Sequence, residues 1–247
     1  MSSNLHQTYY KEYFKGIDWS KKDSFSGKIK ELNVSLTAKG LFSPIQTEVP
    51  FEKFIQLEVL YPGLVTGVGI DHEASIEGEF KLGLHFDWTY GMPVIYGSSV
   101  KGVLRSYFED FYEPKDGQPT KKEAFDDIFN GKNGDGFKSI YDRDIFFDAV
   151  IKKADKDGRI LCSDSITPHK NGPLKNPIPI TFMKIAPGCV IEFRFKLVDT
   201  TIKLEDSNKT LELKADEKLK IFKEILTTVG VGAKTNVGYG QLKAIKQ

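Results

Sequence analysis

The residues best suited to chemistry lie near the C-terminus, where residues 229–243 read VGVGAKTNVGYGQLK. Glycines surround one cation and two short polar side chains, Lys234, Thr235 and Asn236. The glycines are Gly230, Gly232, Gly238 and Gly240. Because glycine has no Cβ atom, another backbone can approach closely. Backbone N–H groups, an ammonium and small polar groups suit a phosphate chain, and the Tyr239 ring suits stacking on a base. The stretch therefore predicts nucleic-acid binding.

Two nucleotide-binding motifs are excluded at this stretch, whereas a simple turn is not. A P-loop needs glycine immediately before its lysine and again five residues earlier, but Ala233 and Thr228 stand there. The dinucleotide fingerprint fails because Thr235 occupies the place of its third glycine. A helix end capped by Gly230 or Gly232, followed by a turn into a strand, remains open as an alternative. That alternative leaves the two later glycines unexplained.

A second candidate site lies in the sequence YGSSVKGVLRS. Gly97 is expected to make a turn, and Ser98 or Ser99 is a good N-cap for a helix. The N–H groups at a helix N-terminus form a ready anion site. Lys101 and Arg105 are four residues apart and lie on one face of that helix. The alternative is an ordinary capped helix with solvated charges.

The pattern of apolar residues predicts the elements that position these two sites. Strands are predicted over residues 54–61, 144–151, 189–199 and 239–246, and helices over 23–36, 98–112, 123–131 and 214–229. Gly131 is a plausible left-handed cap of the short helix. Strands two and three are separated by a long, proline-bearing stretch that we expect to be irregular.

This order of elements predicts an α+β fold. The predicted order is strand, helix, strand, strand, helix, strand. This is the split βαβ pattern of ferredoxin-like and RNA-recognition domains, which form an antiparallel sheet with helices on one face. In the helix over residues 214–229, apolar residues form one face, and we expect Lys214, Lys218, Lys220 and Lys223 to lie largely off it. Residues 1–45 form a helical extension, and residues 46–247 form the domain, with its glycine-rich loop at 229–242.

Composition limits the class of protein. The chain has 247 residues, of which 40% are hydrophobic and 28% charged, which is typical of a soluble globular protein. Residues 170–247 carry 14 Lys and Arg against 8 Asp and Glu, whereas residues 1–169 carry 21 against 26. The basic C-terminal third favours an anionic partner. Cys162 and Cys189 have no metal-like spacing, and no signal peptide or membrane span is recognisable, so we expect a cytoplasmic protein without metal or cofactor.

Several segments resemble a known family. GSSVKGVLR resembles the signature of the repeat-associated mysterious proteins (RAMPs) of CRISPR systems, and GVGAKTNVGYGQL resembles the glycine-rich loop of that superfamily. IFFDAVIKKADKDGRILCSDSITPHK and NPIPITFMKIAPGCVIEFRF are similar in order and content to the family of sixth subunits of the Cmr (type III-B CRISPR) complex. The resemblance covers residues 63–247, and the first 60 residues match loosely.

The resemblance implies a single RAMP domain in an RNA-guided ribonucleoprotein of antiviral defence. Such a subunit is expected to hold the 3′ region of the guide RNA, to cap the filament of backbone subunits, and to contact other RAMP subunits, the small helical subunit and target RNA. No catalytic role is implied, because the target-cleaving aspartate belongs to a different subunit. The expected RNA-binding residues are Gly97, Ser98, Ser99, Lys101, Arg105, Gly232, Lys234, Thr235, Asn236, Gly238, Tyr239, His72 and His85.

Two other functions remain open. Some RAMP ribonucleases use a histidine to activate a 2′-hydroxyl, so His72 with Glu73, or His85 with Asp87, could serve a metal-independent RNase that processes guide RNA. The histidines have no recognised metal spacing, and we expect no enzyme. An assembly-only subunit is the third function, since the aromatic-rich N-terminal segment could dock on a partner or pack into the core.

Overall fold

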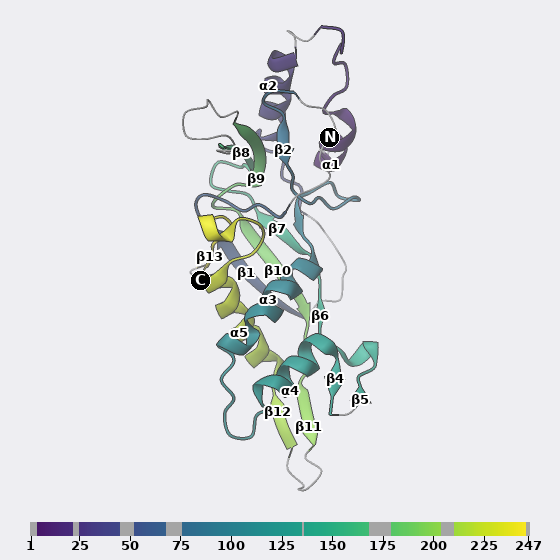
Figure 1. Ribbon diagram of the computed structural model, residues 1–247, viewed down its shortest axis with the longest axis vertical. Coiled ribbons are helices and arrows are strands. Elements are labelled where there is room, and N and C mark those ends of the chain that lie inside the picture. The colour runs from purple at the N-terminus through teal and green to yellow at the C-terminus, as the bar shows by residue number, and fades with distance from the viewer. Residues whose placement is uncertain are drawn as a thin grey trace.

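Six strands form an antiparallel sheet at the centre of the computed structural model (Figure 1). The structure describes residues 4–21, 25–44, 52–67, 76–134, 136–167, 179–203 and 210–245. In spatial order the strands are β13 (Leu242–Ala244), β1 (Lys53–Val59), β10 (Val190–Lys196), β7 (Ala149–Lys153) and β3 (Val94–Ile95), and β6 (Ile145–Phe146) also pairs with β10. The four main strands occur along the chain in the order β1, β7, β10, β13. Numbered one to four in that order, they lie across the sheet as four, one, three, two, so the predicted ferredoxin-like fold is confirmed.

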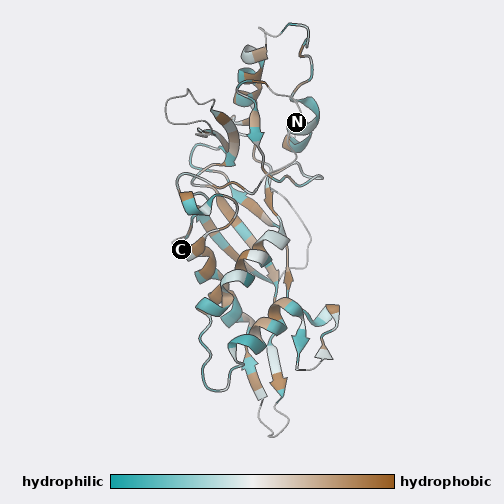
Figure 2. Ribbon diagram, in the orientation of Figure 1, coloured by the Kyte–Doolittle hydropathy of each residue, from teal (hydrophilic) through white to brown (hydrophobic). Residues whose placement is uncertain are grey.

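Two amphipathic helices, α3 (Gly97–Phe111) and α5 (Ala215–Val229), lie side by side on one face of this sheet (Figure 1). Both were predicted within one residue of these bounds. Hydrophobic and hydrophilic residues alternate along strands such as β1, as the period of a half-buried strand requires (Figure 2). The apolar side of the sheet is thereby directed at the helices.

Phenylalanine rings fill the space between the sheet and the helices. The ring of Phe222 on α5 lies 5.6 Å from that of Phe195 on β10 and 5.8 Å from that of Phe146 on β6, measured between centroids. Phe129 stacks on Phe146 at 5.8 Å. Each fully buried phenylalanine side chain stabilises the fold by about 1.5–3 kcal/mol, so this cluster holds α5 against the sheet.

The strand predicted over residues 144–151 is interrupted. Phe195 faces Phe146, whereas Glu192 faces Val150, so the segment that forms β6 and β7 holds one residue more than β10 opposite it. Such a bulge leaves a residue out of the ladder and redirects its side chain. Here it lets Asp148 accept a hydrogen bond from the Gly97 N–H at 2.7 Å, at the start of α3.

The stretch predicted to be irregular contains two strands that the sequence pattern missed. β8 (Leu161–Ile166) and β9 (Ile180–Ile185) pair antiparallel, and β2 (Phe80–Leu82) adds to β9 in parallel. The prolines at 168, 173 and 177 lie outside the described residues. β8 buries few apolar side chains, which explains why its composition did not predict a strand.

The N-terminal residues pack beside this small sheet (Figure 1). Their helices are α1 (Leu5–Gln7), the π-helical turn Thr8–Glu12 and α2 (Phe25–Leu36), the last as predicted. The Tyr9 hydroxyl donates to the Phe80 carbonyl at 2.9 Å, and Tyr9 and Tyr13 are buried. These two aromatic side chains belong to the core, whereas Trp19 is 55% exposed. The domain boundary at residue 45 stays a prediction.

The opposite end of the molecule carries short elements (Figure 1). They are α4 (Lys121–Phe125), the π-helical turn Asp126–Asn130, the hairpin of β4 (Lys132–Asn133) and β5 (Gly136–Phe137), the 3-10 turn Ile140–Asp142, and the hairpin of β11 (Thr200–Lys203) and β12 (Thr210–Leu213). Gly131 ends the short helix in the left-handed conformation, with φ of 64°, as predicted.

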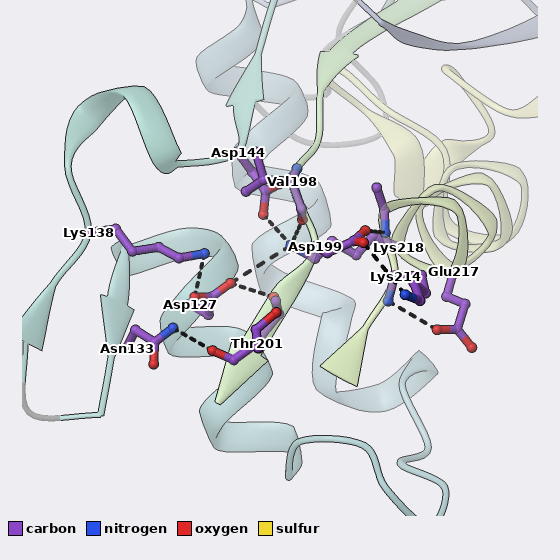
Figure 3. Close-up of polar contacts among 12 residues, drawn as sticks. Asp127, Asn133, Lys138, Asp144, Val198, Asp199, Thr201, Lys214, Glu217 and Lys218 are labelled. Atoms are coloured by element: carbon purple, nitrogen blue, oxygen red, sulfur yellow. Dashed lines mark hydrogen bonds and ion pairs between the residues drawn. The ribbon is translucent and has the colours of Figure 1, made fainter. Parts of the chain in front are cut away.

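One lysine contradicts the amphipathic prediction for α5. Lys218 was expected off the apolar face, but it is fully buried. Its ammonium lies 2.7 Å from both the Asp144 carboxylate and the Val198 carbonyl, as Figure 3 shows. A buried lysine needs such partners because unpaired burial of a charge is very costly.

Candidate nucleic-acid interface

The glycine-rich loop is bound to the turn and strand end that follow β1. The Val231 N–H donates to the Gly240 carbonyl at 3.0 Å, which closes the loop on itself. The Ala233 N–H donates to the Val65 carbonyl at 2.7 Å, and the Gly240 N–H donates to the Gly63 carbonyl at 2.8 Å. These bonds give the loop a fixed frame at the end of α5.

Three of the four glycines are required by this frame. A Cβ atom at Gly230 would lie 2.5 Å from the Gly240 carbonyl oxygen, and one at Gly232 or Gly240 would overlap a carbonyl oxygen of Val65 or Val231. The backbone that approaches these glycines is the protein's own. The expectation that they lie against RNA backbone is therefore corrected, and Gly230 ends α5 as the turn alternative proposed.

Gly238 differs from the other three. Its φ is +96°, but a Cβ atom there would meet only the Pro62 ring carbon at 3.7 Å, an ordinary contact. The positive φ favours glycine at this position, but no atom of the described residues would clash with a Cβ atom there. Gly238 is thus the one of the four loop glycines at which a Cβ atom would not clash with the protein's own backbone.

Lys234 begins the exposed tip of the loop in a strained conformation. Its φ is +61°, and no other non-glycine residue in the described part of the chain has a positive φ. The left-handed region costs an ordinary residue about 1–2 kcal/mol. Its carbonyl accepts the N–H groups of Val237 at 3.1 Å and Tyr239 at 3.3 Å, which hold the turn Thr235–Val237. Asn236 at the tip is exposed.

The side chain of Tyr239 is buried under the loop and is not exposed to solvent as the predicted stacking role requires. Its side chain is 8% exposed and packs with Val65 and Phe182. Its hydroxyl donates to Asp164 at 2.8 Å, and Lys184 lies 5.5 Å from the centre of its ring. Because little ring surface remains for a base, we correct the predicted stacking role: Tyr239 positions the loop.

The charges beneath the loop are mutually compensated. Lys184 forms a close ion pair with Asp164, joining β9 to β8. Burial, the hydrogen bond to Asp164 and its negative charge raise the pKa of Tyr239 to about 12. Burial works against ionisation of Asp164, but the hydrogen bonds from Lys184 and Tyr239 outweigh it and lower the pKa of that carboxyl. Sequence reasoning missed Asp164 and Lys184, because their partner Tyr239 is far away in the chain.

The N-terminus of α3 differs from the prediction. The helix begins at Gly97, so Ser98 and Ser99 lie inside the first turn and Tyr96 is the N-cap. Asp148 takes the Gly97 N–H, so a protein carboxylate already occupies part of the predicted anion site. A Cβ atom at Gly97 would overlap the Phe146 carbonyl, which explains this glycine by packing.

Lys101 and Arg105 share one face of α3, as predicted, but each covers an aromatic ring. The Lys101 ammonium lies 5.7 Å from the centre of the Phe146 ring, and the Arg105 guanidinium lies 5.1 Å from that of Phe125. Lys101 is half-buried and Arg105 is exposed. Burial, together with Arg105 and Arg143 nearby, lowers the pKa of Lys101. These cations form a basic group on the helix.

His85 links the two predicted sites, whereas His72 lies outside the described residues. The backbone N–H of His85 donates to the Thr66 hydroxyl at 2.7 Å, next to the Val65 that binds the glycine-rich loop. Its ring stacks on Tyr96, the N-cap of α3, with centroids 4.4 Å apart. His85 therefore connects the glycine-rich loop to the start of α3. Its backbone bonds to Thr66, beside the residue that binds the loop, and its ring stacks on Tyr96. That Lys234 and Lys101 face one ligand together stays a prediction.

Two negative observations complete the site. Among the residues that the structure covers, no three His, Cys, Asp or Glu side chains are grouped to hold a metal ion. None of the helices described above combines the length and apolar character that a membrane crossing requires.

The fold and the glycine-rich loop place the chain in a family. The model of the RAMP superfamily matches residues 56–243, so the chain belongs to the RAMP superfamily. A chain from the structure of a type III-B Cmr-beta complex bound to cognate target RNA is similar over 93% of this chain, with a TM-score of 0.53 and 23% identity. This chain spans 66% of the length of that chain.

Two smaller solved structures are also similar. Cmr6 from Pyrococcus furiosus matches 78% of this chain and 97% of its own, with 20% identity and a TM-score of 0.38. Cmr4 matches 78% of this chain and 99% of its own, with 14% identity and a TM-score of 0.36. No curated protein matches the chain.

Proposed function

We propose that this RAMP protein is a non-catalytic, RNA-binding subunit of a type III-B CRISPR effector complex in the cytoplasm. In this role it holds the 3′ region of the guide RNA through its phosphates, caps the filament of backbone subunits, and contacts other RAMP subunits, the small helical subunit and target RNA. Membership of the superfamily and the likeness in fold to a chain from a type III-B complex support the proposal.

The observation that carries the proposal is the conformation of Lys234. Strained residues persist where the surrounding structure holds them, and they cluster at ligand sites. Hydrogen bonds on both sides fix Lys234 in the left-handed region at the start of an exposed tip. A flexible surface lysine needs no such arrangement. A lysine that presents its ammonium, with Thr235 and Asn236, to a phosphate chain does benefit from it.

The basic group on α3 supplies the second anchor. Arg105 is exposed, and its guanidinium lies over the Phe125 ring, where its N–H groups can still bind a phosphate at the guanidinium edge. Lys101 lies one turn nearer the helix start, with its ammonium over the Phe146 ring. Contacts to phosphate are independent of base identity, so this surface leaves sequence recognition to the pairing of guide with target.

The packing of His85 supports a non-catalytic role. Its ring is stacked on Tyr96, and a Cβ atom built at Gly67 would lie 3.2 Å from its Cε1 atom. A histidine that activates a 2′-hydroxyl must reach that hydroxyl within hydrogen-bond distance. We assign the His85 ring to packing against Tyr96 at the start of α3.

A salt titration tests the proposal. The full chain is titrated with two unrelated single-stranded RNAs, as wild type, Lys234→Asn and Arg105→Gln. Asparagine tolerates the left-handed region, so Lys234→Asn removes the charge with little added strain. The matched control is Lys115→Gln, an exposed lysine in the loop after α3.

Each site variant should weaken binding to both RNAs equally. Each should also reduce the slope of log K against log salt by about 0.7, the single-strand value for one phosphate contact. The control should keep the wild-type slope. Absence of RNA binding by the wild type, with other subunits still captured, would show an assembly-only subunit. Metal-independent cleavage of the RNA that disappears in His85→Ala would show a processing nuclease.

A further inference from the structure

The structure brings an exposed aromatic ring beside the glycine-rich loop that the sequence pattern did not single out. Tyr61 follows β1 and is 85% exposed. It precedes Pro62, whose ring carbon would lie 3.7 Å from a Cβ atom built at Gly238 of the loop. The Tyr61 phenol also lies near enough to Tyr239 that its ionisation would help to raise the pKa of that buried phenol. Tyr61 thus belongs to the same surface as the loop tip.

The backbone of Tyr61 is fixed relative to the loop, although its side chain is exposed. The Leu60 N–H donates to the Gln241 carbonyl at 2.9 Å, and the Gly63 N–H closes a turn onto the Leu60 carbonyl at 2.9 Å. The Gly63 carbonyl accepts the Gly240 N–H at 2.8 Å. The turn that carries Tyr61 is therefore hydrogen-bonded on both flanks to the loop that carries Lys234.

We propose that Tyr61 is the platform on which a base of the bound single-stranded RNA stacks, while the phosphates of that RNA lie on Lys234. The inference rests on the proposed function and adds a base contact to it. An aromatic ring beside a cationic groove is the usual arrangement for single-stranded nucleic acid, because every base has a π-face. Tyr61 takes the stacking role that sequence reasoning gave to Tyr239.

The position of Tyr61 favours RNA as the occupant of this surface. Single exposed apolar residues need no explanation, and a protein-docking surface requires a contiguous apolar patch. The residues near Tyr61 on this surface are Gly238 and the loop tip, where the polar Asn236 is exposed. Val237 is exposed at the same tip and can contact a ribose or base edge. A polar tip with one rigid aromatic ring suits a flexible nucleotide chain.

The test compares base-bearing RNA with an abasic ribose-phosphate strand of the same length, about 12 nucleotides, within the range that single-strand sites cover. The full chain is measured as wild type, Tyr61→Ala, Tyr61→Leu, Tyr61→Phe and Lys234→Asn. The readout is the ratio of the two affinities, because a variant that folds poorly loses affinity for both strands and leaves the ratio unchanged.

The expected results separate the two proposals. Tyr61→Ala and Tyr61→Leu should weaken binding of base-bearing RNA about 5- to 150-fold, the range for loss of one stacked base, and leave the abasic strand unaffected. Tyr61→Phe should keep the wild-type ratio. Lys234→Asn should weaken both strands by the same factor.

Three outcomes would overturn the inference. If Tyr61→Ala binds both strands as tightly as the wild type, while Lys234→Asn still weakens both, the stacking role is removed and the proposed function stays intact. A loss in Tyr61→Phe as large as that in Tyr61→Ala would indicate a hydrogen bond instead of stacking. Failure of the wild type to bind either strand would overturn the proposed function itself.

Discussion

The Lys218 ammonium lies 2.7 Å from the Asp144 carboxylate, and solvent reaches neither side chain. Asp127 lies 3.8 Å from the same ammonium and 2.7 Å from that of Lys138, so two lysines and two aspartates balance one another. Figure 3 shows this group of four side chains. Burial raises the pKa of Asp144 and lowers the pKa of Lys218. Each charge therefore persists because the other is present, and the network joins α5 to the ends of the sheet strands.

Removing one member of this network should destabilise the protein strongly. Lys218→Met leaves a buried carboxylate without its cation, and we expect a loss of about 3–5 kcal/mol in the free energy of unfolding. Denaturant unfolding at neutral pH measures it. The matched control is Lys220→Met, an exposed neighbour on α5, which should change stability by less than about 0.5 kcal/mol.

A double variant tests whether the loss comes from the unpaired charge. Lys218→Met with Asp144→Asn removes both charges and keeps an acceptor for the Val198 N–H that Asp144 now binds at 2.8 Å. We expect it to be more stable than Lys218→Met alone, since replacing a whole buried pair costs less than breaking it. Equal losses would show that packing of the lysine stem dominates.

Two glycines of the loop should respond differently to alanine. Gly240→Ala places a Cβ atom onto the Val231 carbonyl and also strains a φ of +71°, so the loop must open. Gly238→Ala has space and should cost about 1 kcal/mol, from its φ alone. Thermal melting of both variants measures the difference. A smaller loss for Gly240→Ala than for Gly238→Ala would contradict the frame described for the loop.

The anchor of the loop should make stability depend on alkaline pH. The folded protein holds the Tyr239 proton more tightly than the unfolded chain, because the pKa is raised from 10.0 to about 12. This stabilisation is complete below pH 10.0 and is lost as the pH rises toward about 12. Unfolding free energy measured across that window should therefore fall less steeply in Tyr239→Phe than in wild type. Asp164→Asn should have a smaller effect in the same direction, since it removes the negative charge but keeps an oxygen acceptor and leaves Tyr239 buried.

The Asp148 carboxylate that caps α3 should contribute about 1 kcal/mol to the free energy of unfolding. Asp148→Ala leaves the Gly97 N–H without its acceptor, and helix caps typically contribute about that much. Asp148→Asn keeps an oxygen acceptor but loses the charge at the helix N-terminus, so the cost should be about 0.3–1 kcal/mol. Chemical denaturation of the two variants separates hydrogen bond from charge. Identical losses would assign the whole effect to the charge.

The sequence by itself determined the order of the main elements and hence the fold. Period-two alternation in β1 and the apolar stripes of α3 and α5 are local properties, because each element buries one face against the core. The left-handed cap at Gly131 was also predictable, since it depends on one residue type at a helix end. The split βαβ order then left few topologies open.

Tertiary structure decided the roles of individual site residues. Lys218 and Lys220 look alike in the sequence, but one is buried because Asp144 and Asp127 approach it from other parts of the chain. Tyr239 and Tyr61 are both aromatic residues beside glycines or prolines, yet Asp164 and Phe182 cover the first, and the turn after β1 exposes the second. Burial and pairing of this kind depend on long-range contacts, which local residue patterns do not encode.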